Sequence, residues 1–214
     1  PMYDIFESMG AVWGAQFGLE VPNYFAIGDE TRYEIPSFRR SNAWEATKRE
    51  VMSVRENVGI NEVHNFGKYR VTGADARAWL DRVMAGHIPK KGRLSLTPML
   101  SPKGRLIGDL TVSCLSETEY RLIASYGSQA YHTRWFLQNL EGDVRIENIS
   151  DTVNGFQLAG PNAAKVLQSV IRSDVSKMKF MDVHEMAVGM VNCIVQRVSY
   201  TGDLGYEIYC HAMD

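Results

Sequence analysis

The chain has 214 residues, of which 45% are hydrophobic and 22% are charged, and its formal net charge is −2. This length allows one large domain or two small ones, and the composition is typical of a globular protein. The balanced charge excludes a long-range basic field for nucleic acid or an anionic membrane, and no apolar run approaches the roughly 20 residues that span a bilayer. We therefore expect neither partner.

The three cysteines, Cys114, Cys193 and Cys210, form no C-x-x-C pair. Their odd number does not suggest a disulfide framework, and the five histidines show no metal-ligand spacing with them. We expect buried thiols in a reducing compartment and no metal site.

Residues 1–40 are rich in aromatic residues, glycine and proline and show no clean hydrophobic period. We expect an irregular lead-in segment or an arm that packs on a neighbour. A helix is predicted to begin near Ser41, where Asn42 and Glu45 have the spacing of a capping box.

The run "NFGKYRVTG" predicts a short strand, and "ADARAWLDRVM" predicts an amphipathic helix. The apolar spacing of this helix predicts an inward face of Ala78, Leu80, Val83 and Met84.

The rest of the chain mixes helices with strands that hairpin turns connect. The predicted strands are "RLSLTPML", "RLIGDLTVSCL", "YRLIASY", "VRIENIS", "GFQLAG", "CIVQRVSY" and "YEIYC", and the predicted helices are "SQAYHTRWFLQNL" and "PNAAKVLQSVI". Because hairpins require antiparallel pairing, the predicted class is α+β, with antiparallel sheets and packed helices. We predict a lead-in at 1–40, a first subdomain at 41–150 and a second at 151–214.

The stretch "SPKGRLIGDLTV" carries one acid, Asp109, on a predicted strand. Alternation places Asp109 with Ile107, Thr111 and Ser113 on a mostly polar face. Two interpretations stand at this point. The face is exposed to solvent, which the strand alone favours, or it lines a cleft in which a carboxylate orients or deprotonates a nitrogen.

The stretch "SYTGDLGYEIYC" places Tyr200 and Glu207 on either side of a glycine-containing reversal. A phenol beside a carboxylate suits a flat heterocycle, since the ring can stack and the carboxylate can accept two N–H donors. A half-buried hairpin with the glutamate in water explains the same spacing equally well.

Taken together, four stretches resemble the folate-dependent aminomethyltransferases of glycine cleavage (T-protein), and more closely the folate-binding half of sarcosine and dimethylglycine dehydrogenases. The stretches are "GRLSLTPMLSPKGRLIGDLTV", "FQLAGPNAAKVLQ", "SYTGDLGYEIY" and "GAVWGAQFGLEVPNYFA". The third is similar to the family signature "GYTGE-GYEI", with Asp203 in place of the usual glutamate. The cysteine-containing signature of the iron-sulfur-maturation branch is absent from this chain.

The resemblance implies a residue-by-residue assignment. The family's catalytic aspartate corresponds to Asp109, which follows Gly108 where many glycine-cleavage members have a second acid. The pterin-binding tyrosine and glutamate correspond to Tyr200 and Glu207, and Thr111 joins them as an expected cofactor contact.

The resemblance further implies a T-protein-like folate-binding fold whose last, barrel-like domain would follow Asp214, so we expect the chain to be part of a longer polypeptide. It implies transfer of a one-carbon unit from an iminium or aminomethyl donor to tetrahydrofolate, which forms 5,10-methylenetetrahydrofolate. FAD is expected only if a flavin domain lies upstream. The implied compartment is the cytoplasm, or the mitochondrial matrix in a eukaryote. A folate-binding or scaffold module without catalysis is the second interpretation, and a demethylase with a different methyl donor is the third.

Overall fold

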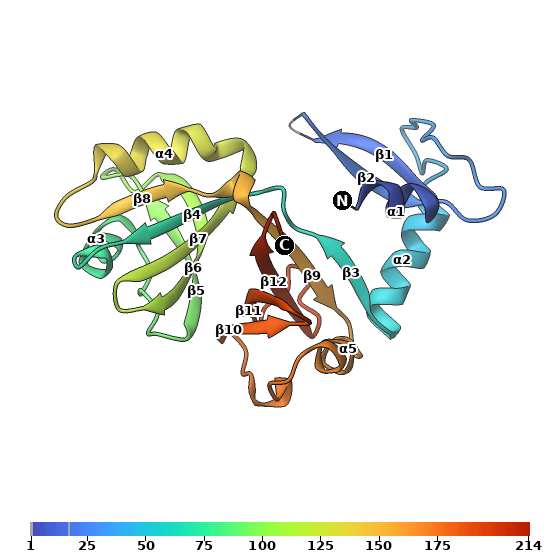
Figure 1. Cartoon of the computed structure of the whole chain (residues 1–214). Coiled ribbons are helices and arrows are strands. Elements are labelled where there is room, and N and C mark those ends of the chain that lie inside the picture. Colours follow the sequence, from blue (N-terminus) through green and yellow to red (C-terminus); the bar gives the residue numbers. More distant parts are fainter. Residues whose placement is uncertain (1, 17) are drawn as a thin grey trace. The chain divides into compact units, whose positions relative to one another are not determined.

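We describe the protein from a computed structural model that covers residues 2–16 and 18–214 (Figure 1). The chain separates into two compact units, residues 1–57 and residues 58–214. The predicted boundaries at residues 40 and 150 stay a prediction, although the chain passes from one sheet to another between Asn148 and Val153.

The first unit contains two helices and a hairpin. Helix α1 is Tyr3–Ser8, strands β1 (Ala11–Gln16) and β2 (Leu19–Phe25) pair antiparallel, and helix α2 is Trp44–Glu56. The prediction of an irregular segment was therefore wrong for the helix and the hairpin, whereas residues 26–40 contain no helix or strand. Aromatic, glycine and proline residues hid the alternation of the two strands, whose inward residues Val12 and Tyr24 are buried.

Helix α2 also begins differently from the prediction. Its N-cap residue is Ala43, which makes no capping bond from its side chain. Asn42 instead accepts a hydrogen bond from the backbone N–H of Ile35 and donates one to the carbonyl of Tyr33. The predicted cap thus holds the preceding loop, because tertiary contacts outcompete the local capping bond.

The second unit is built on two five-stranded antiparallel sheets (Figure 1). The first sheet has the order β5 (Arg93–Leu100), β6 (Leu106–Ser116), β7 (Glu119–Ser125), β4 (Phe66–Thr72) and β8 (Arg145–Asn148). The second sheet has the order β10 (Val183–Val188), β11 (Val191–Gln196), β12 (Gly205–His211), β9 (Val153–Ala159) and β3 (Gly59–Glu62). These pairings confirm the predicted α+β class with antiparallel sheets. Strands β3 and β10 were not predicted.

Each sheet packs against helices through its own core. Helices α3 (Ala76–Val83) and α4 (Gln129–Gln138) cover one face of the first sheet, and α5 (Ala163–Val170) lies on the second sheet. Three short 3₁₀ turns complete the unit: Tyr126–Ser128, Ser150–Thr152 and Val175–Lys177.

The inward face of α3 differs in part from the prediction. Leu80, Val83 and the following Met84 are buried as expected, but Ala76 and Trp79 are buried in place of Ala78. The reason is Trp79, whose indole N–H donates to the carbonyl of Asn139 while its ring packs on Phe136, so the helix turns this side toward the core.

Candidate functional site

One face of the second sheet carries a row of polar side chains across four strands. The pairs Gln196–Glu207, Glu207–Gln157 and Gln157–Asn61 are directly opposite in register. Residues opposite one another in an antiparallel pair project from the same face. The row is desolvated from Gln196, which is 1% exposed, to Gln157, which is 4% exposed, whereas Asn61 at its other end is exposed.

Gln196 connects this row to the first sheet. Its Nε2 donates to Oγ of Ser113 on β6 over 2.9 Å, while its Oε1 is buried and has no hydrogen-bond partner among the described residues. A buried acceptor of this kind costs free energy until a donor reaches it. The row therefore offers an unused acceptor to a ligand.

Glu207 lies in the middle of the row. The hydroxyl of Tyr209 donates to its Oε2 over 2.9 Å. Burial raises the pKa of the Glu207 carboxyl, and the bond from Tyr209 opposes this rise only in part. The pKa of Tyr209 is likewise raised well above its usual value, by burial first and then by the charge of Glu207. The carboxylate is desolvated and would gain from further N–H donors.

Strand β6 brings the predicted residues of the first sheet toward this row. Leu110, Val112 and Cys114 point into the core, so Thr111 and Ser113 project from the opposite face. Ser113 reaches the second sheet through Gln196, and Thr111 is half-buried on the same face. The predicted alternation of this strand is confirmed for these residues.

Asp109 lies two residues further along the same face and is exposed, opposite Pro98 of β5. Within the described part of the chain, it makes no hydrogen bond or ion pair with Tyr200 or Glu207. Strand β6 is thus held against the second sheet by the bond between Ser113 and Gln196, whereas the Asp109 carboxylate does not contact that sheet's proposed site residues.

Ile107 departs from the predicted face. The pairing of β5 with β6 shifts between Met99 and Leu100, and Ile107 packs against the core of the first sheet. A bulge of this kind reverses the alternation locally and cannot be read from the hydrophobic pattern.

Tyr200 lies in the loop that joins β11 to β12, and its side chain is 84% exposed. Its backbone N–H donates to Oε1 of Gln157 over 3.1 Å, so the loop is tied to the polar row. The reversal uses Gly202 at a φ of 77°, a left-handed conformation that favours glycine. Tyr200 thus lies in the loop that precedes the strand of Glu207, with its aromatic ring exposed.

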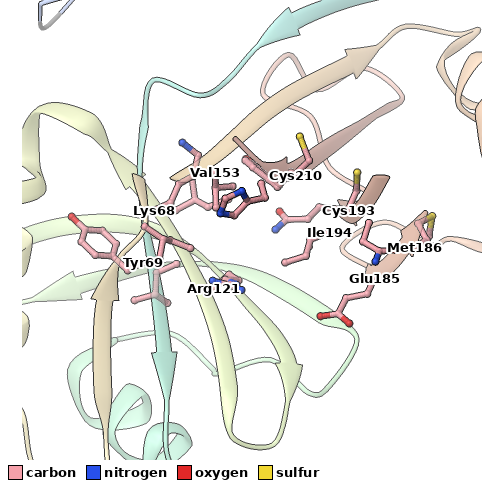
Figure 2. A pocket seen from close by; sticks show the side chains of 16 residues that line it. Lys68, Tyr69, Arg121, Val153, Glu185, Met186, Cys193, Ile194 and Cys210 are labelled. Atoms are coloured by element: carbon pink, nitrogen blue, oxygen red, sulfur yellow. The ribbon is translucent and has the colours of Figure 1, made fainter. Parts of the chain in front are cut away.

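A cavity of about 480 Å³ opens between the two sheets of the second unit (Figure 2). Its walls are mostly apolar and include Ile123, Val153 and Ile194, with Lys68 and Arg121 on the side of the first sheet. None of the four predicted site residues lines it. Gln196 of the polar row lines this cavity together with Tyr209, whose hydroxyl binds Glu207, so one end of the row borders the cavity.

Lys68 and Arg121 were missed by the sequence analysis. Lys68 is 2% exposed, its Nζ donates to the carbonyls of His64 and Phe66, and burial lowers its pKa to about 8. Arg121 pairs with Glu119 at 3.3 Å, and its buried Nε has no partner among the described residues. Lys68 lies on β4 and Arg121 on β7, and the hydrophobic alternation of these strands predicts burial only on the face opposite to these two side chains.

The chain belongs to the GCVT N-terminal domain family. The family matches residues 2–214. Among curated relatives, human dimethylglycine dehydrogenase, which is named as mitochondrial, is 37% identical over 97% of this chain and 24% of its own length. Aminomethyltransferase of Bacillus subtilis (strain 168) is 28% identical over 100% of this chain and 55% of its own length. This chain thus spans about a quarter of the length of the dehydrogenase and about half of the length of the aminomethyltransferase. The resemblance derived from the sequence is confirmed at the level of the family.

Two solved structures are similar to this GCVT N-terminal domain. Glycine cleavage system aminomethyltransferase T from Bartonella henselae superposes with a TM-score of 0.79 and 20% identity, over 98% of this chain and 52% of that protein. Heterotetrameric sarcosine oxidase from Corynebacterium sp. U-96 gives a TM-score of 0.59 and 18% identity, over 83% of this chain and 89% of that one. The aminomethyltransferase likeness confirms the predicted T-protein-like fold.

Residues 2–16 and 18–214 offer neither a metal site nor a membrane-spanning helix. They contain no group of three or more His, Cys, Asp or Glu side chains placed to hold a metal ion. Across the same residues, no helix has both the length and the apolar character needed to cross a membrane.

Proposed function

We propose that the chain is a tetrahydrofolate-dependent one-carbon transfer module of a sarcosine- or dimethylglycine-dehydrogenase-like protein. It would form 5,10-methylenetetrahydrofolate from an iminium or aminomethyl donor, whose amine leaves protonated when its bond to the transferred carbon breaks. The observation that carries this proposal is the desolvated polar row of the second sheet, in which Glu207 has one hydrogen-bond donor and Gln196 keeps an unused acceptor. Membership of the GCVT N-terminal domain family supports it.

The residues of the row fit a reduced pterin. A pterin has an amidine-like edge with several N–H donors, and a carboxylate accepts two such donors in parallel. Glu207 would accept at this edge, and the unpaired Oε1 of Gln196 would accept a further N–H. The exposed ring of Tyr200 would stack on the heterocycle, and Thr111 would contact it from β6.

When bound, tetrahydrofolate supplies the amine nucleophile that captures the one-carbon unit. Asp109 would orient the reacting nitrogens, take up the proton that the nucleophilic amine loses, and stabilise the positive charge that develops there. Its carboxylate is exposed, so both a bound ligand and solvent can reach it.

The relatives support a proposal for the donor and the partner. The share of the dimethylglycine dehydrogenases that this chain spans leaves room for other domains, and the solved sarcosine oxidase is a heterotetramer. We infer that a flavin-bearing domain or subunit oxidises an N-methyl amine and delivers the product to this module. The compartment would be the mitochondrial matrix in a eukaryote and the cytoplasm in a bacterium.

The test separates binding from transfer. Titration calorimetry of the chain with tetrahydrofolate measures binding, and quenched-flow product analysis with an aminomethyl donor measures 5,10-methylenetetrahydrofolate against a control without protein. We expect saturable binding and a rate above that control. Binding without acceleration would favour the non-catalytic folate-binding module, and no binding would reject both.

A further inference from the structure

His132 lies directly behind the backbone that carries Asp109. It belongs to α4, is 2% exposed, and packs among the rings of Tyr131 and Phe136. A Cβ built on Gly108 would lie 2.4 Å from Nε2 of this imidazole. No side chain other than hydrogen fits at position 108 while His132 keeps this place.

The imidazole is bonded to the strand. Its Nε2 lies 3.3 Å from the carbonyl oxygen of Ile107. Since a carbonyl can only accept, Nε2 must carry the proton, and Nδ1 of the neutral ring is then an acceptor. Nδ1 is buried and has no hydrogen-bond partner within the described residues. A phenylalanine would fill this space without that unsatisfied atom, so packing alone does not account for a histidine here.

His132 and Asp109 also interact electrostatically, although they lie on opposite faces of β6. Burial lowers the pKa of His132, while the bond to the Ile107 carbonyl and the negative charge of Asp109 raise it. The ring therefore responds to the charge of Asp109 across the strand.

We propose that His132 is a positioning residue for Asp109. By holding the carbonyl of Ile107 through a glycine gap at Gly108, it fixes the backbone of residues 107–109 where the pairing of β5 with β6 shifts. This backbone aims the Asp109 carboxylate at the reacting nitrogen. The inference rests on the proposed role of Asp109.

The first test compares His132→Phe with His132→Gln. Glutamine places an amide N–H near the position of Nε2, whereas phenylalanine keeps the packing and loses the donor. Because a misplacement of about 1 Å can cost about 10²-fold, we expect His132→Phe to lower kcat for transfer about 10- to 100-fold with KM for tetrahydrofolate unchanged. His132→Gln should recover most of the rate. The control is His87→Gln, at an exposed histidine, with no effect expected.

Full activity of His132→Phe would overturn the proposal. A fall in its kcat/KM that comes from a higher KM with kcat unchanged would overturn it too. If His132→Phe does not fold, Gly108→Ala serves instead, because its Cβ must displace the ring. The transfer rate of Gly108→Ala should fall below that of the wild type. The further fall from His132→Gln to the double variant Gly108→Ala/His132→Gln should be smaller than this. Additive losses would contradict the shared site.

The second test does not depend on folate chemistry. Proton–carbon NMR of the histidine Cε1–H groups gives the pKa of His132 in the wild-type chain and in Asp109→Asn. We expect a lower pKa for His132 when the carboxylate is removed, and no change for His87. An unchanged His132 pKa would overturn the coupling. A wild-type chain that binds no tetrahydrofolate would reject the proposed function while leaving this NMR result interpretable on its own.

Discussion

Asp109 and Glu207 are both carboxylates of the proposed site, and the two sheets give them opposite surroundings. Asp109 is exposed at the open end of β6, whereas Glu207 sits within a desolvated row and accepts a hydrogen bond from Tyr209. Burial penalises the charge of Glu207 and raises its pKa. The two acids therefore suit different roles. The solvated Asp109 is suited to move a proton, and the desolvated Glu207 is suited to accept fixed hydrogen bonds from a ligand.

The largest expected effect is on transfer by Asp109→Asn. General-base assistance is worth about 10²- to 10⁴-fold, so we expect a loss of transfer rate in this range with affinity for tetrahydrofolate mostly unchanged. Quenched-flow product analysis and calorimetry on the same preparation measure the two quantities. Equal loss of rate and affinity, or loss of neither, would remove the assigned role.

Glu207→Ala should weaken binding instead. A hydrogen bond to a charged group contributes about 1.5–3 kcal/mol, which corresponds to a rise in Kd of about 10- to 150-fold. Glu185→Ala is the matched control, since Glu185 is an exposed acid on β10 of the same sheet. Unchanged affinity of Glu207→Ala by calorimetry would count against the binding row.

Tyr200→Ala should have a smaller effect on the same Kd. Stacking of an aromatic ring contributes about 0.5–1.5 kcal/mol, so we expect a 2- to 12-fold rise without a change of folding stability, because the ring is exposed. Tyr33→Ala, at another exposed tyrosine, controls for loss of surface aromatic area. Equal effects of the two variants would show that Tyr200 has no specific contact.

The smallest expected effect is on the stability of the unliganded chain. The folded-state pKa of Glu207 is raised, so its contribution to stability is full below the pKa of the unfolded state and is lost as pH rises through the folded-state pKa. At neutral pH, Glu207→Gln should therefore raise Tm, by about 2–4 °C for each kcal/mol recovered. Asp109→Asn should leave Tm unchanged. Calorimetric scans at pH 5 and pH 8 test the sign, since the gain from Glu207→Gln should shrink at pH 5; a gain that grows there would contradict it.

Strands with a strong pattern in the second unit could be predicted from the sequence, and Leu110, Val112 and Cys114 of β6 point inward as the alternation required. Strands β3 and β10 could not, because each is short and has few buried residues that would mark it. The same limit applies to the capping of α2, where Asn42 bonds to a loop that lies outside its own turn.

Less of the site could be predicted than of the fold. Tyr200 and Glu207 were singled out from one hairpin, and their assignment with Asp109 and Thr111 as site residues stays a prediction. The row that surrounds Glu207 depends on the order β11-β12-β9-β3, which joins strands far apart in sequence. Gln157 and Gln196 therefore had no local signal, and their burial follows only from the packing of two sheets.

The most direct test of the central claim is a crystal structure of the chain bound to 5-methyltetrahydrofolate. We expect the pterin edge against Glu207 and Gln196, its ring on Tyr200, and the N5 side of the pterin toward Asp109. A pterin bound elsewhere, for example in the cavity against Lys68 and Arg121 with Glu207 and Tyr200 uncontacted, would contradict it.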